Sequence, residues 1–304
     1  MIDKVIEQHK IEPSRWRKIM ANCTKHAVMT IRPSSRLLAD SIDFNSFIKI
    51  VTIHHHNQEK CQYINGVVFK KDVSSRRMRT QIENPKILLL NGSLGYVQED
   101  DGLIDIPAEI SQQESFIRII RQKIKALKPD IIFVEKDASR LALQVLEEDK
   151  ITVVTNTSAK MLKMIARQTQ TIVCPSTNLL DKRFVVGYCL NFRIEPIKNA
   201  PKKNHKSLAE TTSLMFLEGC QAKLGCSIVL SGPDMAEIKL VRKALKVCLK
   251  TARILLIERE LFRFFVPQIE DFRNAESTTQ QQQQEPDSQT QNDEHPDLQF
   301  RELH

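Results

Sequence analysis

The chain has 304 residues, of which 41% are hydrophobic and 27% charged, an ordinary balance for a folded protein with room for two domains. No apolar run approaches the roughly 18 residues of a membrane span, and the N-terminus lacks the apolar core of a signal peptide, so we expect a protein that is soluble or peripheral through partners. The net charge is +8, and residues 151–206 hold ten Lys/Arg against two Asp/Glu, which suits nucleic acid, phosphoinositide or an acidic partner, or else a plain solvated basic face.

The N-terminal 40 residues predict helices, because apolar residues recur there at spacings of three and four. Pro13 fits the first turn of the second helix. Residues 47–53 and 63–69 then read as strands, with Asn65-Gly66 as a turn or bulge. The three histidines at 54–56 follow the first strand, and neighbours on a strand point to opposite sides, so we predict no metal site there.

From residue 85 the pattern alternates between strand and helix. Such alternation predicts a parallel sheet with right-handed crossovers. Ser158 and Asp137 stand where helix caps are expected. The predicted strands are 85–90, 131–136, 151–156 and 171–175, and the predicted helices are 114–127, 138–149 and 158–169.

The C-terminal part begins with a strand at 184–195. Two further strands, 212–218 and 226–231, are joined by GCQAKLG and predict a hairpin. A long amphipathic helix follows at 233–262, with Pro233 in its first turn. The Gln-rich residues 266–304 have too little apolar surface to offset the entropy of ordering, so we expect a disordered tail.

Two groups of residues are candidates for chemical sites. Cys220 and Cys226 have five residues between them, whereas structural zinc usually takes four ligands in closer pairs, so buried thiols are the preferred interpretation. The segment 135–137 (Glu-Lys-Asp) follows a strand at the carboxyl end of the sheet, where sites often lie, although capping and surface charge explain it more simply. We therefore predict no catalytic, cofactor or metal residues.

The helix 158–169 gives the candidate binding site. Lys160, Lys163 and Arg167 are three and four residues apart and share one helical face. We predict this face as a partner-binding surface, with a plain solvated face as the alternative. Nucleic acid is not expected as the partner, because few aromatic residues accompany the basic ones.

Four motifs carry a resemblance to a known family. YINGVVFKKDVSSRRMRTQIENPKILLLNGSLGY, FVEKDASRLALQVLEEDKITVV, MLKMIARQTQTIVCP and LMFLEGCQAKLGC resemble the chaperonin-like domain of PIKfyve-type phosphatidylinositol-3-phosphate 5-kinases, and more distantly group II chaperonins. The similarity runs from about residue 14 to 262. Ser231 stands where the family usually has Arg, and the zinc finger, the kinase core and the Gly-Asp-Gly-Thr-Thr phosphate loop of chaperonins are not found.

The resemblance implies an α/β fold, a GroEL apical-like domain inserted into a smaller α+β intermediate-like domain. The expected parts are 1–61 and 196–265 as the two intermediate-like halves, 62–195 as the apical-like domain, and 266–304 as the tail. The resemblance implies a non-catalytic scaffold without a cofactor, in the cytoplasm or peripheral at endosomal or vacuolar membranes. Its implied partners are the scaffold and phosphatase subunits of a phosphoinositide kinase complex, with weak contact to anionic lipid; the alternative is a chaperonin-like protein that holds unfolded clients without ATPase activity.

Overall fold

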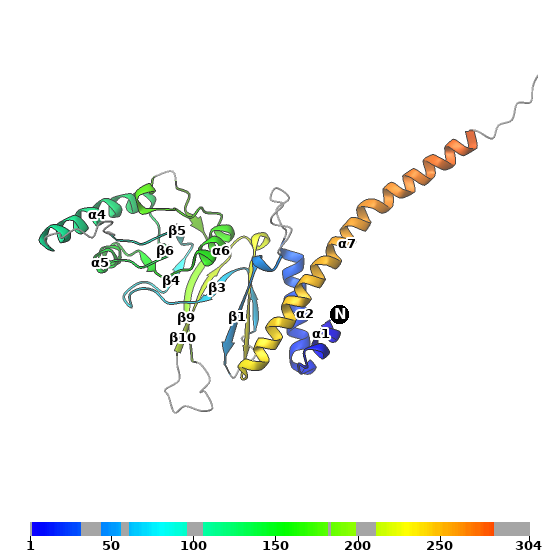
Figure 1. Ribbon diagram of the computed structural model, residues 1–304, viewed down its shortest axis with the longest axis horizontal. Coiled ribbons are helices and arrows are strands. Elements are labelled where there is room, and N and C mark those ends of the chain that lie inside the picture. Colours follow the sequence, from blue (N-terminus) through cyan, green and yellow to red (C-terminus); the bar gives the residue numbers. More distant parts are fainter. Residues whose placement is uncertain are drawn as a thin grey trace, which may run out of the picture. The chain divides into compact units, whose positions relative to one another are not determined.

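The computed structural model describes residues 2–31, 44–55, 61–95, 106–181, 184–198 and 211–282. It divides the chain into two compact units, residues 1–253 and residues 254–304. The first unit holds all three sheets and is shown with the rest of the chain in Figure 1. The α/β fold class that the sequence predicts is confirmed.

Two helices open the first unit. α1 spans Ile2–Gln8 and α2 spans Pro13–Thr30, with Pro13 in its first turn as predicted. Trp16 and Met20 of α2 are completely buried, which follows from their four-residue spacing on one helical face.

The first sheet joins segments from opposite ends of the unit. Its strand order is β1-β11-β2, with bounds Ile48–His54, Cys226–Gly232 and Gln62–Ile64. β1 pairs with β11 in parallel, with Ile48 opposite Cys226, and β2 pairs with β11 antiparallel. The N-terminal part of the chain therefore meets the C-terminal part, as the resemblance implies.

The second sheet is antiparallel and contains β3, β10, β9 and β4 in that order. Their bounds are Gly66–Lys70, Thr211–Glu218, Asn191–Lys198 and Gln81–Glu83. The predicted turn or bulge at Asn65-Gly66 is the point where the chain passes from β2 in the first sheet to β3 in the second. Gly66 has φ +151°, and a Cβ there would lie 1.9 Å from the Leu217 carbonyl oxygen.

The predicted hairpin at 212–231 is wrong. β10 and β11 lie in different sheets, because both edges of β11 are already paired with β1 and β2. The connection turns away at Gly219 (φ +71°) and makes a short 3-10 helix, Ala222–Leu224. The hydroxyl of Ser227 on β11 ties the two sheets together: it donates to the Gly66 carbonyl at 2.7 Å and accepts from the Val68 N–H at 2.9 Å.

The third sheet is the α/β part, with strand order β7-β6-β5-β8. The strands β5, β6 and β7 are parallel as predicted, and the short β8 pairs antiparallel with β5. Their bounds are Thr152–Val154 for β7, Ile131–Val134 for β6, Lys86–Leu90 for β5 and Gly187–Tyr188 for β8. The predicted strand 171–175 is reduced to one bridge between Cys174 and Leu90, because β8 occupies the other end of the same edge of β5.

Helices cover both faces of this sheet (Figure 1). α4 (Ile106–Leu127) and α5 (Arg140–Glu148) contribute to one buried cluster, and α6 (Ala159–Thr169) contributes to the other. The cap of α5 is Ser139, whose hydroxyl accepts from the Ala142 N–H at 3.2 Å, and not Asp137 as expected. Asp137 lies too early in the chain and instead accepts a hydrogen bond from the Asn156 side chain.

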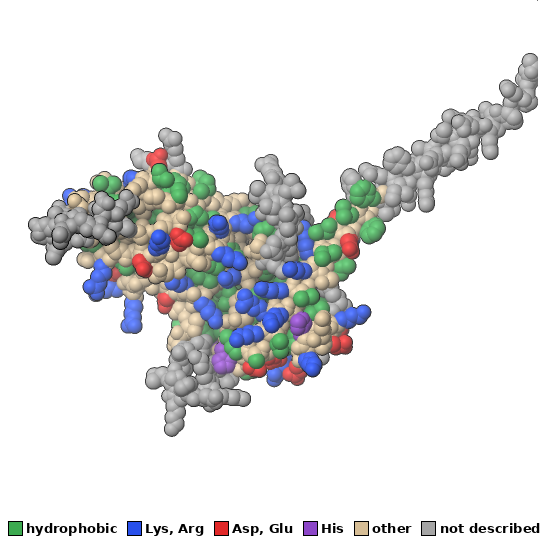
Figure 2. Space-filling view, viewed as in Figure 1, with side chains coloured by type: hydrophobic (Ala, Val, Ile, Leu, Met, Phe, Trp, Pro, Cys, Tyr) green, Lys and Arg blue, Asp and Glu red, His purple; other side chains and the backbone are tan. Residues whose placement is uncertain are grey.

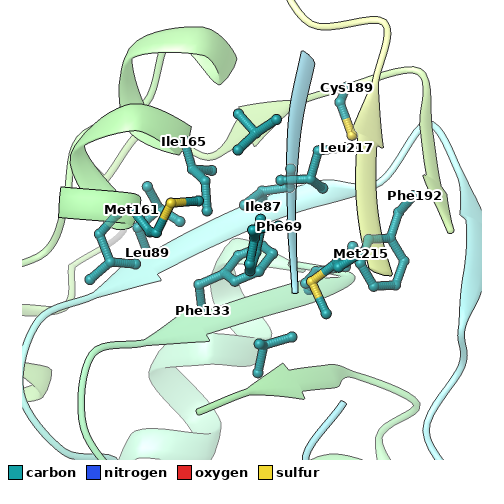
Figure 3. Close-up of a cluster of buried hydrophobic side chains, with 14 of the residues drawn as sticks. Phe69, Ile87, Leu89, Phe133, Met161, Ile165, Cys189, Phe192, Met215 and Leu217 are labelled. Carbon is teal, nitrogen blue, oxygen red and sulfur yellow. The ribbon is translucent and has the colours of Figure 1, made fainter. Parts of the chain in front are cut away.

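The cluster beneath α6 also joins the second and third sheets (Figure 3). Phe69 of β3 and Phe133 of β6 lie with ring centroids 6.1 Å apart, an ordinary distance for an aromatic pair. Met161 and Ile165 of α6 pack into the same cluster from above. The side of α6 that carries its apolar residues is thus fixed against the sheets.

The last helix, α7, spans Met235–Gln282 and continues from the first unit into the second. In the first unit it buries Ile238, Val241, Leu245 and Cys248, at spacings of three and four. It ends 20 residues beyond Phe262, the predicted end, and so includes the start of the predicted tail. Residues 263–282 hold four Gln, two Glu and two Arg, which are residue types that favour helix. Residues 283–304 of the predicted tail lie outside the described residues.

Candidate functional site

The predicted binding face on α6 has two different parts. Lys160 and Lys163 are exposed. Arg167 is half-buried: its Nε donates to the Leu224 carbonyl oxygen at 2.9 Å, and its guanidinium carbon lies 3.8 Å from the centroid of the Phe47 ring. Arg167 therefore ties α6 to the 219–225 connection, and Lys160 and Lys163 remain as the exposed cations of the face.

Lys160 stands beside a cleft that the sequence did not predict. The cleft has a volume of about 490 Å³ and lies where β1, the end of β3, the start of α6 and the first turns of α7 come together. Its walls are formed by Lys49, Ile50, Val51, Thr52, Phe69, Lys70, Lys71, Asn156, Thr157, Ser158, Met161 and Arg242.

The charged side chains of the wall are all positive. Lys49 lies on β1, Lys70 and Lys71 lie at the end of β3, and Arg242 lies on α7. No Asp or Glu is among the wall residues. Figure 2 shows Lys and Arg side chains gathered on this face, over the region where β1, β3, α6 and the start of α7 lie in Figure 1.

The lysines influence one another. Burial lowers the pKa of Lys49, and the nearby positive charges of Lys160 and Arg242 lower it further. Burial also lowers the pKa of Lys70. Lys71 donates to the Asn156 carbonyl oxygen at 3.2 Å. In the part of the chain that the structure describes, no carboxylate within ion-pair distance of Lys49, Lys70 or Arg242 offsets this repulsion, so the site favours an anion.

Polar groups at the start of α6 complete the wall. Ser158 is the N-cap residue, and its carbonyl accepts from Met161 and Leu162, but its hydroxyl makes no capping bond. The hydroxyl of Thr157 is buried and has no hydrogen-bond partner among the described residues, although Thr157 lines the cleft and is only 3% exposed. A buried hydroxyl without a partner is unfavourable, so an occupant with acceptor oxygens suits this wall.

Sequence reasoning found Lys160 but missed the wall residues Lys49, Lys70, Lys71 and Arg242. They come from three elements that are far apart in the chain, and no spacing rule connects them. The only sequence signal was the excess of basic residues, which does not say where the charges meet.

A second exposed feature is apolar. Five large side chains near the edge strand β8 are between 53% and 64% exposed: Ile172, Leu179, Val185, Tyr188 and Leu190. The Thr171 hydroxyl donates to the Val185 carbonyl oxygen, which holds the segments 171–172 and 184–190 side by side. We call these five residues the β8 patch.

The remaining candidate residues have the following surroundings in the fold. Glu135 accepts from the Gly92 N–H at 3.2 Å, and all seven cysteines are free thiols. His54 lies on β1 with Nε2 2.8 Å from the Pro233 carbonyl oxygen. The described residues contain no group of three or more His, Cys, Asp or Glu arranged to hold a metal ion.

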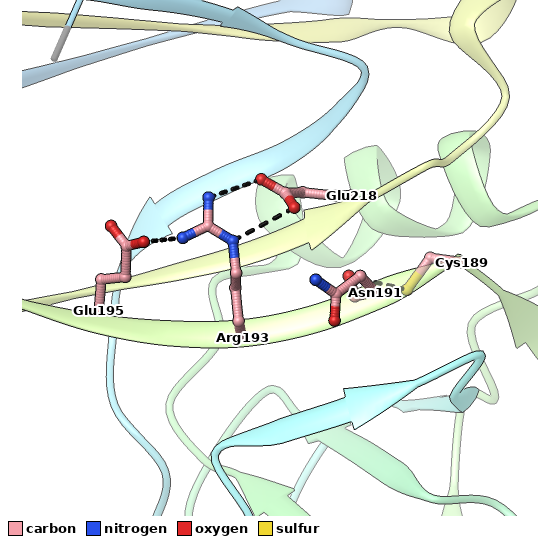
Figure 4. A network of polar contacts seen from close by, with 5 residues as sticks. All are labelled: Cys189, Asn191, Arg193, Glu195 and Glu218. Carbon is pink, nitrogen blue, oxygen red and sulfur yellow. Dashed lines mark hydrogen bonds and ion pairs between the residues drawn. The ribbon is translucent and has the colours of Figure 1, made fainter. Parts of the chain in front are cut away.

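A polar network on the second sheet is likewise a cross-strand link (Figure 4). Arg193 of β9 donates to both carboxylate oxygens of Glu218 on β10, at 2.7 and 3.2 Å, and also pairs with Glu195. Its guanidinium carbon lies 4.0 Å from the centroid of the Phe216 ring. Arg193, Glu195 and Glu218 therefore pair with one another, and the network links β9 to β10.

The architecture defines the class of the protein as chaperonin-like. The structure resembles the open-state monomer of a group II chaperonin from Methanococcoides burtonii, with a TM-score of 0.54, 16% identity, and coverage of 83% of this chain and 62% of that one. Among the helices that the structure describes, none has the length and apolar content to cross a membrane.

The sequence identifies the family. Residues 10–262 match the TCP-1/cpn60 chaperonin family, and the chain belongs to that family. The mouse and human 1-phosphatidylinositol 3-phosphate 5-kinases are each 32% identical, over 78% and 76% of this chain. The T-complex protein 1 subunit gamma of Dictyostelium discoideum is 28% identical over 81% of it.

The coverage of these relatives is very unequal. The chain spans 11% of the length of each of the two mammalian lipid kinases and 46% of the Dictyostelium chaperonin subunit. What is similar to this chain is thus one part of a much longer kinase.

Proposed function

We propose that this chain is a non-catalytic regulatory module of a phosphatidylinositol-3-phosphate 5-kinase assembly, and that it binds protein partners through the β8 patch. The relatives of about 30% identity are kinases of that name, and two of them match 78% and 76% of this chain. If the chain is a piece of a longer kinase, the parent reaction is ATP-dependent 5-phosphorylation of phosphatidylinositol 3-phosphate.

The β8 patch is the observation that supports binding. Four large apolar side chains of the patch, Ile172, Val185, Tyr188 and Leu190, are each more than half exposed and lie on two adjoining segments at the edge of a sheet. Exposed apolar groups of this kind mark interaction surfaces in soluble proteins. The proposed occupants are the scaffold and phosphatase subunits of the kinase assembly, which would bring the module to endosomal or vacuolar membranes.

The proposed domain organisation fits the same role. We propose that residues 62–195 form the apical-like domain, held between the intermediate-like halves 1–61 and 196–265. The parallel pairing of β1 with β11 supports this arrangement, because it brings the two halves together. A partner bound at the apical-like domain then leaves the intermediate-like domain free for other contacts.

Binding to the purified scaffold and phosphatase subunits, measured by calorimetry, tests the proposal. Tyr188→Ser and Val185→Ser should each weaken binding about tenfold, as expected for buried anchors of an interface. Met29→Ser is the matched control, because Met29 is 57% exposed but lies on α2. The absence of binding to both subunits, or kinase activity of the chain by itself, would overturn the proposal.

The alternative function uses the same patch to hold unfolded clients without ATPase activity. It predicts that substoichiometric amounts of the chain suppress aggregation of a denatured test protein, and that Tyr188→Ser reduces the suppression. Suppression without binding to the kinase subunits would favour this alternative.

A further inference from the structure

We propose that the basic cleft between β1, β3, α6 and α7 is a binding site for a small ligand with two or more phosphate groups, an inositol phosphate either free or as the headgroup of a lipid. The phosphate chemistry follows from the walls of the cleft. The choice of an inositol ring rests on the function proposed above.

The charge of the cleft favours an anion. Lys49, Lys70, Lys71 and Arg242 line a space of about 490 Å³ without any acidic wall residue, and Lys160 lies near enough to act on Lys49. Bringing like charges together on partly buried side chains is unfavourable unless a counter-charge is present. Several cations around one space suit a ligand with several phosphates better than one with a single charge.

The polar groups of the wall select for phosphate oxygens. Thr157 lines the cleft, and its buried hydroxyl has no hydrogen-bond partner among the described residues. The Ser158 hydroxyl makes no capping bond to α6 and is also available. The start of α6, an 11-residue helix, adds the positive end of its dipole to this wall. Lysines, hydroxyls and helix N–H groups are the donors that phosphate sites commonly use.

The apolar wall residues and the volume of the cleft limit the shape and size of the ligand. Phe69 and Met161 line the cleft and also belong to the buried cluster of Figure 3. They are apolar surface against which the carbon atoms of a ring can pack. A volume of about 490 Å³ lies in the range of roughly 300–1,000 Å³ that is usual for small-molecule sites.

Two probes test the site and separate the two sources of ligand. Inositol 1,3-bisphosphate is titrated into the full chain by calorimetry, and flotation is measured with phosphatidylcholine vesicles with and without phosphatidylinositol 3-phosphate. Saturable binding of the soluble probe together with phosphoinositide-dependent flotation assigns the site to a lipid headgroup. Binding of the soluble probe alone assigns it to a free inositol phosphate.

Variants locate the binding. Lys49→Gln and Lys70→Gln should each weaken binding of the soluble probe about tenfold, because each removes one charged donor. Thr157→Val should weaken it less, because it removes a neutral donor at constant size. The matched control is Arg118→Gln, which removes one exposed positive charge from α4, on the opposite face of the third sheet.

Several results would overturn the site. One is that neither probe binds. Another is that the Lys49→Gln and Lys70→Gln variants, folded by circular dichroism, bind as tightly as the unchanged chain. A third is that Arg118→Gln weakens binding of the soluble probe as much as Lys49→Gln does. This result would mean that the net charge of the chain alone attracts the probe. Tyr188→Ser should leave the phosphate titration unchanged, so failure of the cleft is distinguishable from failure of the β8 patch.

Discussion

Trp16 Nε1 donates a 2.7 Å hydrogen bond to Glu237 Oε1 across 221 residues of sequence. Trp16 is completely buried on α2, and Glu237 lies in the first turn of α7. The bond thus connects the N-terminal helices to the C-terminal helix of the first unit, in parallel with the pairing of β1 with β11. This hydrogen bond and this strand pair both link the two ends of the unit.

Trp16→Phe should therefore lower the free energy of unfolding by about 2 kcal/mol or more, because it removes a donor to a charged acceptor and leaves unfilled volume. Urea unfolding followed by circular dichroism measures the loss. Glu237→Gln keeps an acceptor oxygen, so it should lower the free energy of unfolding by roughly half as much or less. A Trp16→Phe variant as stable as the unchanged chain would show that the bond contributes nothing.

Gly66→Ala should strongly destabilise the fold, because Gly66 lies where the chain passes from β2 to β3. The new Cβ would lie 1.9 Å from the Leu217 carbonyl oxygen, so the pairing of β3 with β10 must shift. We expect a loss of about 3 kcal/mol or more, measured by thermal or urea unfolding. Gly92→Ala is the control: its φ is also positive, +83°, but nothing lies within 4 Å of the new Cβ, and about 1 kcal/mol is expected. Equal losses would contradict the steric account.

Asp149 should give the fold a pH-dependent contribution. Hydrogen bonds from Arg121, at 2.6 and 2.7 Å, and the nearby Lys125 lower the pKa of Asp149. An Asp whose pKa is lowered on folding stabilises the protein above its unfolded pKa of about 3.9, and this contribution is lost as the pH falls toward the folded value. Asp149→Asn should therefore lower the free energy of unfolding at pH 7. The difference in this free energy between the variant and the unchanged chain should shrink below about pH 4.

Glu148→Gln is the matched control for this prediction. Glu148 lies 3.7 Å from the same Arg121 but its side chain is 56% exposed, so its removal should have a small effect at every pH. Unfolding free energies measured from pH 3 to 7 test the pair. A Glu148→Gln loss as large as that of Asp149→Asn would show that burial is not what makes the Asp149 link strong.

The cysteines should differ sharply in reactivity. Six of them are buried, and only Cys61 is partly exposed. Burial raises the pKa of Cys23 to about 11 and that of Cys226 to about 12, so both stay protonated at neutral pH. A thiol reagent applied to the folded chain at pH 8 should label Cys61 first, although burial also raises the pKa of that thiol.

Mass spectrometry of the labelled chain checks this order. Cys61→Ser should remove the first label, whereas Cys248→Ala, a change at a buried thiol, should leave it in place. Early labelling of Cys220 or Cys226 would mean that the 219–225 connection opens in solution, which the present fold does not explain.

The sequence by itself determined the elements and their class. Periodicities of three to four residues identified α2, α4, α5 and α6, and short apolar runs identified β5, β6 and β7, because these patterns record which side of each element faces a core. Family motifs then indicated the chaperonin-like fold, and this is confirmed. The face of α6 was predicted in the same way, and its Lys160 lies beside the cleft.

Only the tertiary structure decided which elements are neighbours. β10 and β11 are adjacent in sequence and look like a hairpin, yet β11 pairs with the distant strands β1 and β2, and β10 pairs with the preceding strand β9 and with the distant β3. The cleft depends on the same choices, since Lys49, Lys70 and Arg242 meet only after β1, β3 and α7 have packed. Local patterns fix the inward face of a strand or helix, but pairing and charge clustering arise from contacts between distant residues, which no local pattern encodes.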